Sequence, residues 1–292
     1  MKIDAHQHFW KLARGDYDWL TPDLKPLYRD FGPDDLKPLL EAAGIDGTIA
    51  VQAADTEAET EYLLSLTDRH EWIVGVVGWT DLEAKDAPAT IERMAQHSKL
   101  VGFRPMIQDI EDDAWMLKDS LRPALDTMVA HNLTFDALVL PRHLGHLCEF
   151  LKKYPNLRVV IDHGAKPEIH QGHFDGWAAD MTVIAKSNQA FCKLSGLTTE
   201  AGPDWRPDDI SDYIEKILQV FTPARVLFGS DWPVLNLASN YDAWSSIVQC
   251  AAKGHSPDIF ETSVQKAYPR LNVAKKLEFM RPPEQPHLTG PV

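Results

Sequence analysis

This chain of 292 residues has few cysteines and lacks a long apolar run. Both features restrict the classes of protein to which it can belong. Cys148, Cys192 and Cys250 are odd in number, and their spacing resembles neither a zinc knuckle nor a redox pair. We therefore expect buried free thiols in a reducing compartment. No apolar stretch approaches the roughly 18 residues of a membrane span, and no signal-peptide pattern is visible. Together these features predict a soluble, cytoplasmic protein.

Basic residues are also scarce relative to acidic ones. The chain has 29 Lys and Arg against 43 Asp and Glu, a formal net charge of −14. Binding to nucleic acid requires a basic stripe, and binding to an anionic membrane surface requires basic residues as well. The charge therefore predicts neither partner, and it leaves a small-molecule substrate open because local pocket charge can oppose the global sign. We expect a monomer or a homodimer.

Short apolar runs alternate with helical patterns along the chain. The runs that favour buried strands are residues 2–8, 47–52, 72–79, 99–105, 133–140, 157–163, 190–196 and 225–231. Helical patterns cover residues 32–44, 56–70, 88–97, 120–132, 142–154, 174–188, 207–221, 240–253 and 259–268. Eight strand–helix units predict a single-domain α/β protein, a (β/α)8 TIM barrel over residues 1–275. The polar, Pro-rich segment 276–292 is predicted to be a separate C-terminal tail. A doubly wound sheet is the alternative, disfavoured by the lack of a Gly-rich nucleotide turn.

In a barrel of this kind, chemistry belongs at the carboxyl ends of the strands. The polar and aromatic residues at those ends are His6, His8, Gln52, Trp79, Thr80, Asp81, Arg104, Asp162, His163, Lys193, Ser195, Ser230 and Asp231. Because side chains two apart on a strand point the same way, His6 and His8 should converge. Such a pair is a metal site, an acid–base site, or two hydrogen-bonded histidines without chemistry.

Contact with solvent would explain why the residues at the strand ends are polar, but it would not explain why they are of these particular types. Three histidines with Arg104, Lys193 and Asp231 favour a functional cluster. Taken singly, His163 is equally well explained as a core histidine, and Arg104 and Lys193 as structural ion pairs. Asp231 ends a buried strand and needs a partner there.

Three segments carry a family resemblance. DAHQHFW at the first strand, VVIDHGAKP at the sixth and LFGSDWPV at the eighth resemble the amidohydrolase superfamily. They are most similar to its sugar lactonase branch, of the L-fuconolactonase and L-rhamnono-lactonase type. The resemblance extends over residues 2–275 and implies a (β/α)8 barrel of hydrolases.

Site roles follow from the resemblance. It implies that His6, His8, His163 and Asp231 bind metal, with Asp231 also the general base. Family members with two metals carry a Lys or Glu on the fourth strand and a His on the fifth, whereas here the fourth ends in Arg104. The resemblance therefore implies one divalent ion, zinc first, weakly bound or dispensable.

The expected reaction is hydrolysis of a sugar (aldono-) lactone by water. Asp231 is the expected base, and His6 and His8 bind the metal or polarise the carbonyl directly. Arg104 or Lys193 stabilises the oxyanion, and His163 binds metal or protonates the ring oxygen. We expect Gln52, Trp79, Trp232 and Arg104 to contact the substrate.

Two alternatives remain open at this stage. One is a hydrolase or decarboxylase of an anionic aromatic or pyrone-type substrate in the same superfamily. It would place several arginines at the mouth, with Arg104, Arg142 and Arg206 as candidates. The other is a non-catalytic sugar-binding barrel.

Overall fold

The computed structural model describes residues 1–271, and the predicted tail 276–292 lies outside the described residues. Eight strands pair in parallel, in chain order from the first to the eighth. They are β1 (Ile3–Gln7), β2 (Gly47–Val51), β3 (Ile73–Gly78), β4 (Leu100–Phe103), β5 (Thr134–Ala137), β6 (Val159–Ile161), β7 (Phe191–Leu194) and β8 (Val226–Phe228). Each lies inside the range predicted for it, and the predicted (β/α)8 barrel is confirmed.

Main-chain bonds just beyond β8 close the barrel. The Asp231 amide donates to the His6 carbonyl at 2.8 Å, and the His8 amide donates to the Trp232 carbonyl at 2.7 Å. Closure thus joins the end of β1 to the segment that follows β8. It brings four of the predicted site residues, His6, His8, Asp231 and Trp232, to one edge.

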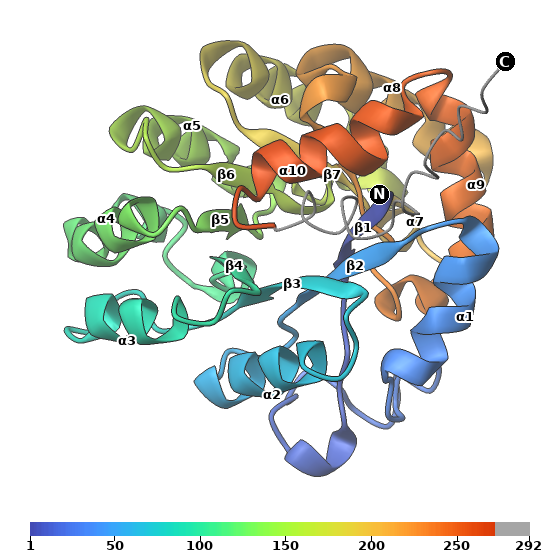
Figure 1. Ribbon diagram of the computed structural model, residues 1–292. Coiled ribbons are helices and arrows are strands. Elements are labelled where there is room, and N and C mark those ends of the chain that lie inside the picture. Colours follow the sequence, from blue (N-terminus) through green and yellow to red (C-terminus); the bar gives the residue numbers. More distant parts are fainter. Residues whose placement is uncertain (272–292) are drawn as a thin grey trace, which may run out of the picture.

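Helices surround the strands (Figure 1). They are α1 (Pro33–Ala43), α2 (Glu57–Thr67), α3 (Ala87–Met94), α4 (Arg122–Ala130), α5 (Leu144–Lys153), α6 (Asp175–Ser187), α7 (Leu197–Ala201), α8 (Pro207–Phe221), α9 (Tyr241–Ala252) and α10 (Ser263–Ala267). Capping side chains fix some of the starts, since Thr56 and Asn240 accept from the amides of Glu59 and Ala243. The helix predicted over 259–268 is instead a π-turn, Asp258–Thr262, followed by α10. The short α7 was not predicted.

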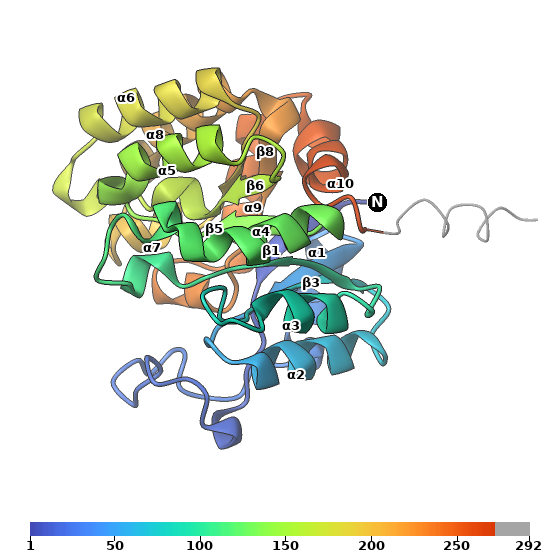
Figure 2. The same ribbon diagram turned by 90° about the vertical axis from the view of Figure 1, so that its left-hand side faces the viewer.

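Two apolar layers hold the barrel together. The larger one packs the outer faces of the strands against the helices. The smaller one includes Ile49, Val77, Leu227 and Tyr268, so α10 and the residue after it close the amino-terminal end of the strands. In Figure 2 the N-terminus and α10 lie at one end, and the loop between β1 and α1 extends toward the other.

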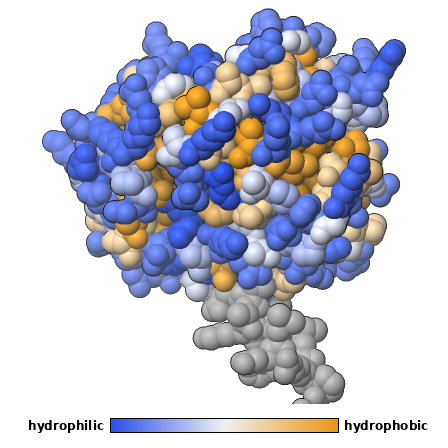
Figure 3. Space-filling view, turned by 90° about the horizontal axis from the view of Figure 1, so that it is seen from above, coloured by the Kyte–Doolittle hydropathy of each residue, from blue (hydrophilic) through white to orange (hydrophobic). Residues whose placement is uncertain are grey.

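Figure 3 shows a face on which hydrophilic residues predominate, with apolar side chains between them. Within residues 1–271, no helix is long and apolar enough to span a membrane.

Candidate active site

Two glycines allow the histidines of the site to approach their neighbours. A Cβ built on Gly229 would lie 2.7 Å from the His6 Cβ, and one on Gly196 would lie 2.8 Å from His163 Nδ1. Gly196 also has a φ of +70°, a region that favours glycine. Any larger side chain at either position would displace a histidine of the site.

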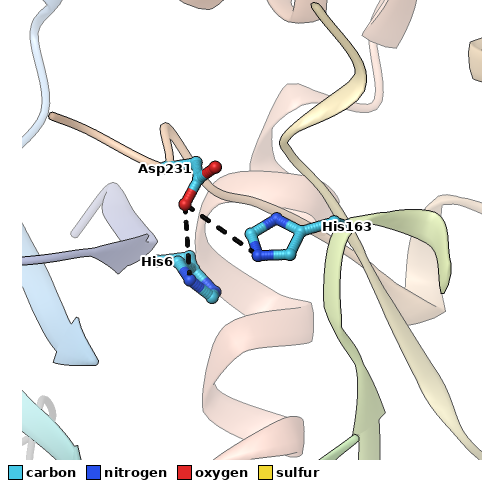
Figure 4. Close-up of side chains that lie close together, drawn as sticks. All are labelled: His6, His163 and Asp231. Atoms are coloured by element: carbon cyan, nitrogen blue, oxygen red, sulfur yellow. Dashed lines mark ion pairs between the residues drawn. The ribbon is translucent and has the colours of Figure 1, made fainter. Parts of the chain in front are cut away.

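His6, His163 and Asp231 form the centre of the site (Figure 4). Asp231 Oδ1 lies 3.7 Å from His6 Nε2 and 3.9 Å from His163 Nε2. One ligand atom from each of the three lies within 4.8 Å of the others. All three side chains are buried. This is the metal-ligand type predicted from the sequence, with β1, the turn after β6 and the segment after β8 each supplying one residue.

His8 lies beside this centre rather than within the group of three. Its Nδ1 is 2.8 Å from the Val51 carbonyl, which only accepts, so Nδ1 carries a hydrogen and donates. Its Nε2 lies 3.2 Å from His6 Nε2 and 3.3 Å from Asp231 Oδ1. The pair therefore converges as the i, i+2 spacing predicted, but the fixed ring of His8 contacts Asp231 from the side.

Lys193 lies beneath His6, completely buried. Its Nζ is 3.1 Å from His6 Nδ1, 2.5 Å from Asp136 Oδ2 and 2.9 Å from Asp162 Oδ1. An ammonium has only hydrogens to offer, so His6 Nδ1 is the acceptor in this contact. The buried lysine thus sets the orientation of His6 from below.

The carboxylates around Lys193 have contrasting pKa values. Burial raises the pKa of Asp136 to about 6, even though Lys193 opposes the shift. Burial would raise the pKa of Asp162 as well, but the charge of Lys193 and then His6 holds it well below its usual range. Tyr268 donates to Asp136 at 2.8 Å. The barrel interior therefore contains an ionic network, in which Asp162 stays ionised to lower pH than Asp136 does.

The pKa values of Asp231 and His163 are both lowered, whereas the pKa of Asp136 is raised. Burial favours the neutral form of Asp231, but the neighbouring His163 and His8 overcome it and hold its pKa well below the usual range. Burial lowers the pKa of His163 to about 4, so its ring is neutral at pH 7. Ser195 Oγ lies 2.9 Å from His163 Nδ1 and fixes the ring. The site therefore offers an ionised carboxylate beside neutral imidazoles.

A cavity of about 360 Å³ opens above this centre. Of the predicted residues, His8, Arg104, His163 and Asp231 line it. Its other lining residues are Trp19, Leu24, Ala53, Met106, Gln108, Asp109, Leu138, Lys166, Val234 and Leu237. The wall thus combines seven apolar residues with seven polar or charged ones.

Other predicted substrate contacts lie away from this surface. Gln52 is buried, and its amide donates to the Arg104 carbonyl at 2.8 Å. Trp232 is buried and packs edge-on against the ring of Phe31. The backbone of Trp79 is held by the hydroxyl of Thr60. None of these three residues, nor Lys193, lines the cavity.

Some residues of the site were not predicted. Lys166 lines the cavity three positions after His163, and Asp136 and Asp162 pair with Lys193 below it. Asp162 was visible at its strand end beside His163, but nothing in its apolar surroundings indicated a partner. Lys166 lies in a turn, where no periodic pattern marks function.

The residues present fit a divalent cation. Two imidazole nitrogens and a carboxylate oxygen are a common ligand set for a catalytic zinc, which keeps a further position open for water. An ion held by the His6 ring would have Asp162 Oδ1 behind it, 3.5 Å from His6 Nδ1, as a carboxylate that can orient the ring. The chemistry of the donor set therefore suits one ion.

A closed parallel barrel with a His-x-His pair ending its first strand and an Asp following its eighth defines a class of hydrolases. The chain belongs to the amidohydrolase family, whose model matches residues 3–262.

Two curated relatives show which enzymes of this family the chain is similar to. The chain is 46% identical over 263 residues to an L-fucono-1,5-lactonase of Burkholderia ambifaria, an alignment that covers 88% of this chain and 90% of the relative. It is 36% identical to an L-fucono-1,5-lactonase of Burkholderia multivorans, over 85% of this chain and 88% of that one.

A solved structure agrees with the fold in detail. The crystal structure of a zinc-bound amidohydrolase from Burkholderia multivorans matches with a TM-score of 0.86 and 33% identity. The match covers 92% of this chain and 99% of that one.

Proposed function

We propose that this protein is a lactone hydrolase that opens a sugar lactone, an aldono-1,5-lactone of the L-fucono type, by attack of water on the ring ester. The observation that carries the proposal is the ionised Asp231 carboxylate at the base of a cavity, with His6 and His163 within 3.9 Å of it. The names of the curated relatives support the lactone as substrate.

Asp231 accepts the proton of the attacking water in this proposal. Water adds to the carbonyl carbon, the ring C–O bond breaks, and the ring oxygen takes up a proton as the hydroxyl of the acid product. A carboxylate with so low a pKa is a weak base, so transfer to it is favourable only if the water is made more acidic. A divalent ion, proposed as zinc and held by His6, His163 and Asp231 with His8 alongside, supplies that acidity and polarises the carbonyl when bound.

Arg104 is the proposed stabiliser of the oxyanion. Its guanidinium lines the cavity, with Nη1 3.4 Å from His6 Nε2. Nη2 donates to the Gln52 carbonyl, which fixes the group. A preorganised cation in a dry site stabilises developing negative charge at little reorganisation cost. Gln52 thus supports Arg104 from behind, and Lys193 supports His6 in the same way.

The charges of the cavity do not favour the anionic-substrate alternative. Arg104 is the one arginine among its lining residues in the described part of the chain. Arg142 instead pairs with Asp113 at 2.8 Å, and Arg206 begins α8 away from the cavity. A dicarboxylate would require more cations than this surface presents.

A panel of aldonolactones tests the proposal. We expect turnover of one or more 1,5-lactones, followed by acid release with a pH indicator, before and after treatment with a chelator. Asp231→Asn should lower kcat by about 100-fold or more, because it removes the proton acceptor. No turnover above background on any lactone would refute the function, and full activity of Asp231→Asn would refute the assigned base. A non-catalytic sugar-binding barrel predicts binding without turnover.

A further inference from the structure

Lys166 occupies an unusual backbone position at the wall of the cavity. His163, Gly164, Ala165 and Lys166 have φ values of 52°, 58°, 63° and 47°, four consecutive left-handed residues. Each non-glycine residue in this region costs about 1 kcal/mol or more, and such strain is found mainly where a side chain must be aimed. The turn directs both His163 and Lys166 toward the same cavity, and both line it.

Glu200, in α7, is the partner of Lys166. The Lys166 Nζ lies 3.8 Å from Glu200 Oε1, too far for a direct hydrogen bond. Both side chains are about one-quarter exposed. Burial raises the pKa of Glu200, the charge of Lys166 opposes the shift, and the charge of Asp231 adds to it. The ammonium retains hydrogens that no described residue accepts.

Arg104, the other cation that lines the cavity, is also neutralised by a nearby carboxylate. Arg104 Nη1 lies 3.6 Å from Asp162 Oδ2, so each cation has a carboxylate within 4 Å. The lining itself carries Asp109 and Asp231 against Arg104 and Lys166. A ligand carboxylate entering here would find its cations already neutralised and carboxylates close by. A hydroxyl has no such penalty, because it is neutral and accepts from an ammonium.

We propose that Lys166 donates a hydrogen bond to a hydroxyl oxygen of the neutral sugar lactone, and that Glu200 neutralises Lys166 so that lactones bearing a free carboxylate are rejected. This inference rests on the proposed lactone hydrolysis and adds the charge class of the substrate. Rejection by an unfavourable charge is a common source of specificity. Lys166 is the substrate-contacting residue, and Glu200 is its positioning residue.

Two variants separate the roles. Lys166→Met should raise KM for a neutral aldono-1,5-lactone about tenfold, with kcat changed less than about threefold, because a charge-assisted hydrogen bond is lost. Glu200→Gln should raise kcat/KM for an aldarolactone, which carries a free carboxylate, about tenfold relative to the neutral lactone. The double variant should lose that gain, because no uncompensated ammonium remains.

Glu168→Gln is the matched control, because Glu168 lies in the same loop but pairs with the exposed His173 and does not line the cavity. It should leave the preference unchanged. The proposal would be overturned if Glu200→Gln preferred the neutral lactone over the acidic one to the same extent as the wild type.

A binding measurement keeps this inference distinct from the proposed function. A polyhydroxylated δ-lactam, the amide isostere of the lactone, is titrated by calorimetry into the wild type, Lys166→Met and Glu168→Gln. Weakening of about tenfold in Lys166→Met alone supports the contact, even if no lactone is turned over and the lactonase function fails. Equal affinity in all three proteins refutes it, whatever the activity.

Discussion

Lys193 shows at the scale of one residue how a charge can belong to a site without touching its ligand. Its ammonium is fully buried between Asp136 and Asp162 and contacts His6 Nδ1 from below the cavity. A lysine at this strand end was predicted to be catalytic or to form a structural ion pair. The contacts show the ion pair, and through it the lysine orients a histidine of the site.

Removing Lys193 should be costly for the fold. Lys193→Met would leave two buried carboxylates without their cation, a change that costs about 3–5 kcal/mol. The double variant Lys193→Met/Asp136→Asn should recover part of this loss, because one of the orphaned charges is removed. Urea unfolding of the wild type and both variants measures the effect. If Lys193→Met stays within about 1 kcal/mol of the wild type, the network is not a source of stability.

At the scale of the element, the strands were predictable because each is a short apolar run bounded by turn residues, as in β2 and β8. Strand ends then located His8, Arg104, His163 and Asp231 on the cavity. The five-residue α7 was missed because one turn and a half leaves no helical period to detect. Lys166 was missed for a related reason, since its position depends on a left-handed turn that sequence patterns do not reveal.

Helix α2 contributes a second buried acid near the site. Glu59 Oε2 accepts from the amides of Ala53 and Ala54, at 2.9 and 2.7 Å, and Ala53 lines the cavity. The Ala53 carbonyl in turn accepts from the Trp19 indole at 2.7 Å. One carboxyl at the start of α2 thus holds the segment after β2 and, through it, an aromatic residue of the cavity wall.

Glu59 should make stability depend on pH. Burial raises its pKa from 4.5 to about 7, so the folded protein binds an extra proton between these values. Stability from this group is fully present below about pH 4.5 and is lost as pH rises through 7, by about 3 kcal/mol. In Glu59→Gln the amide oxygen can still accept from both N–H groups, and this loss should vanish.

Urea unfolding at pH 5 and pH 8 checks the prediction for Glu59. The difference in unfolding free energy between Glu59→Gln and the wild type should move in favour of the variant as pH rises. Glu168→Gln, on an exposed loop, provides the comparison. A pH-independent difference would show that Glu59 is not protonated in the folded protein at pH 5.

At the scale of the whole molecule, an acidic protein surrounds a site with balanced charge. The net charge of −14 lies mostly on the surface, while the cavity pairs Arg104 and Lys166 with carboxylates of their own. Composition therefore predicted no polyanionic partner, but it said nothing of the charge of the pocket. The sequence lacks the fourth- and fifth-strand ligands of the two-metal family members. The described structure agrees with this, because it groups the ligands of a single ion, His6, His163 and Asp231.

Because of the positions of these three ligands, we expect a bound cation to stabilise the entire fold. They come from β1, the turn after β6 and the segment after β8, so a cation that they bind joins both ends of the strand order. A ligand that binds only the folded state stabilises it by about 2.7 kcal/mol at 100 times its Kd. For a domain of this size, that corresponds to a rise in Tm of roughly 4–5 °C.

Thermal unfolding after dialysis against a chelator, with and without added zinc chloride, measures the rise. Asp231→Asn should lose most of it, because amide oxygen is a poorer zinc ligand than carboxylate, whereas the exposed His173→Gln should keep it. An equal rise in all three proteins would mean that zinc binds elsewhere. No rise in any of them would mean that the imidazoles and Asp231 form their hydrogen-bonded arrangement without an ion, and that Arg104 alone stabilises the oxyanion.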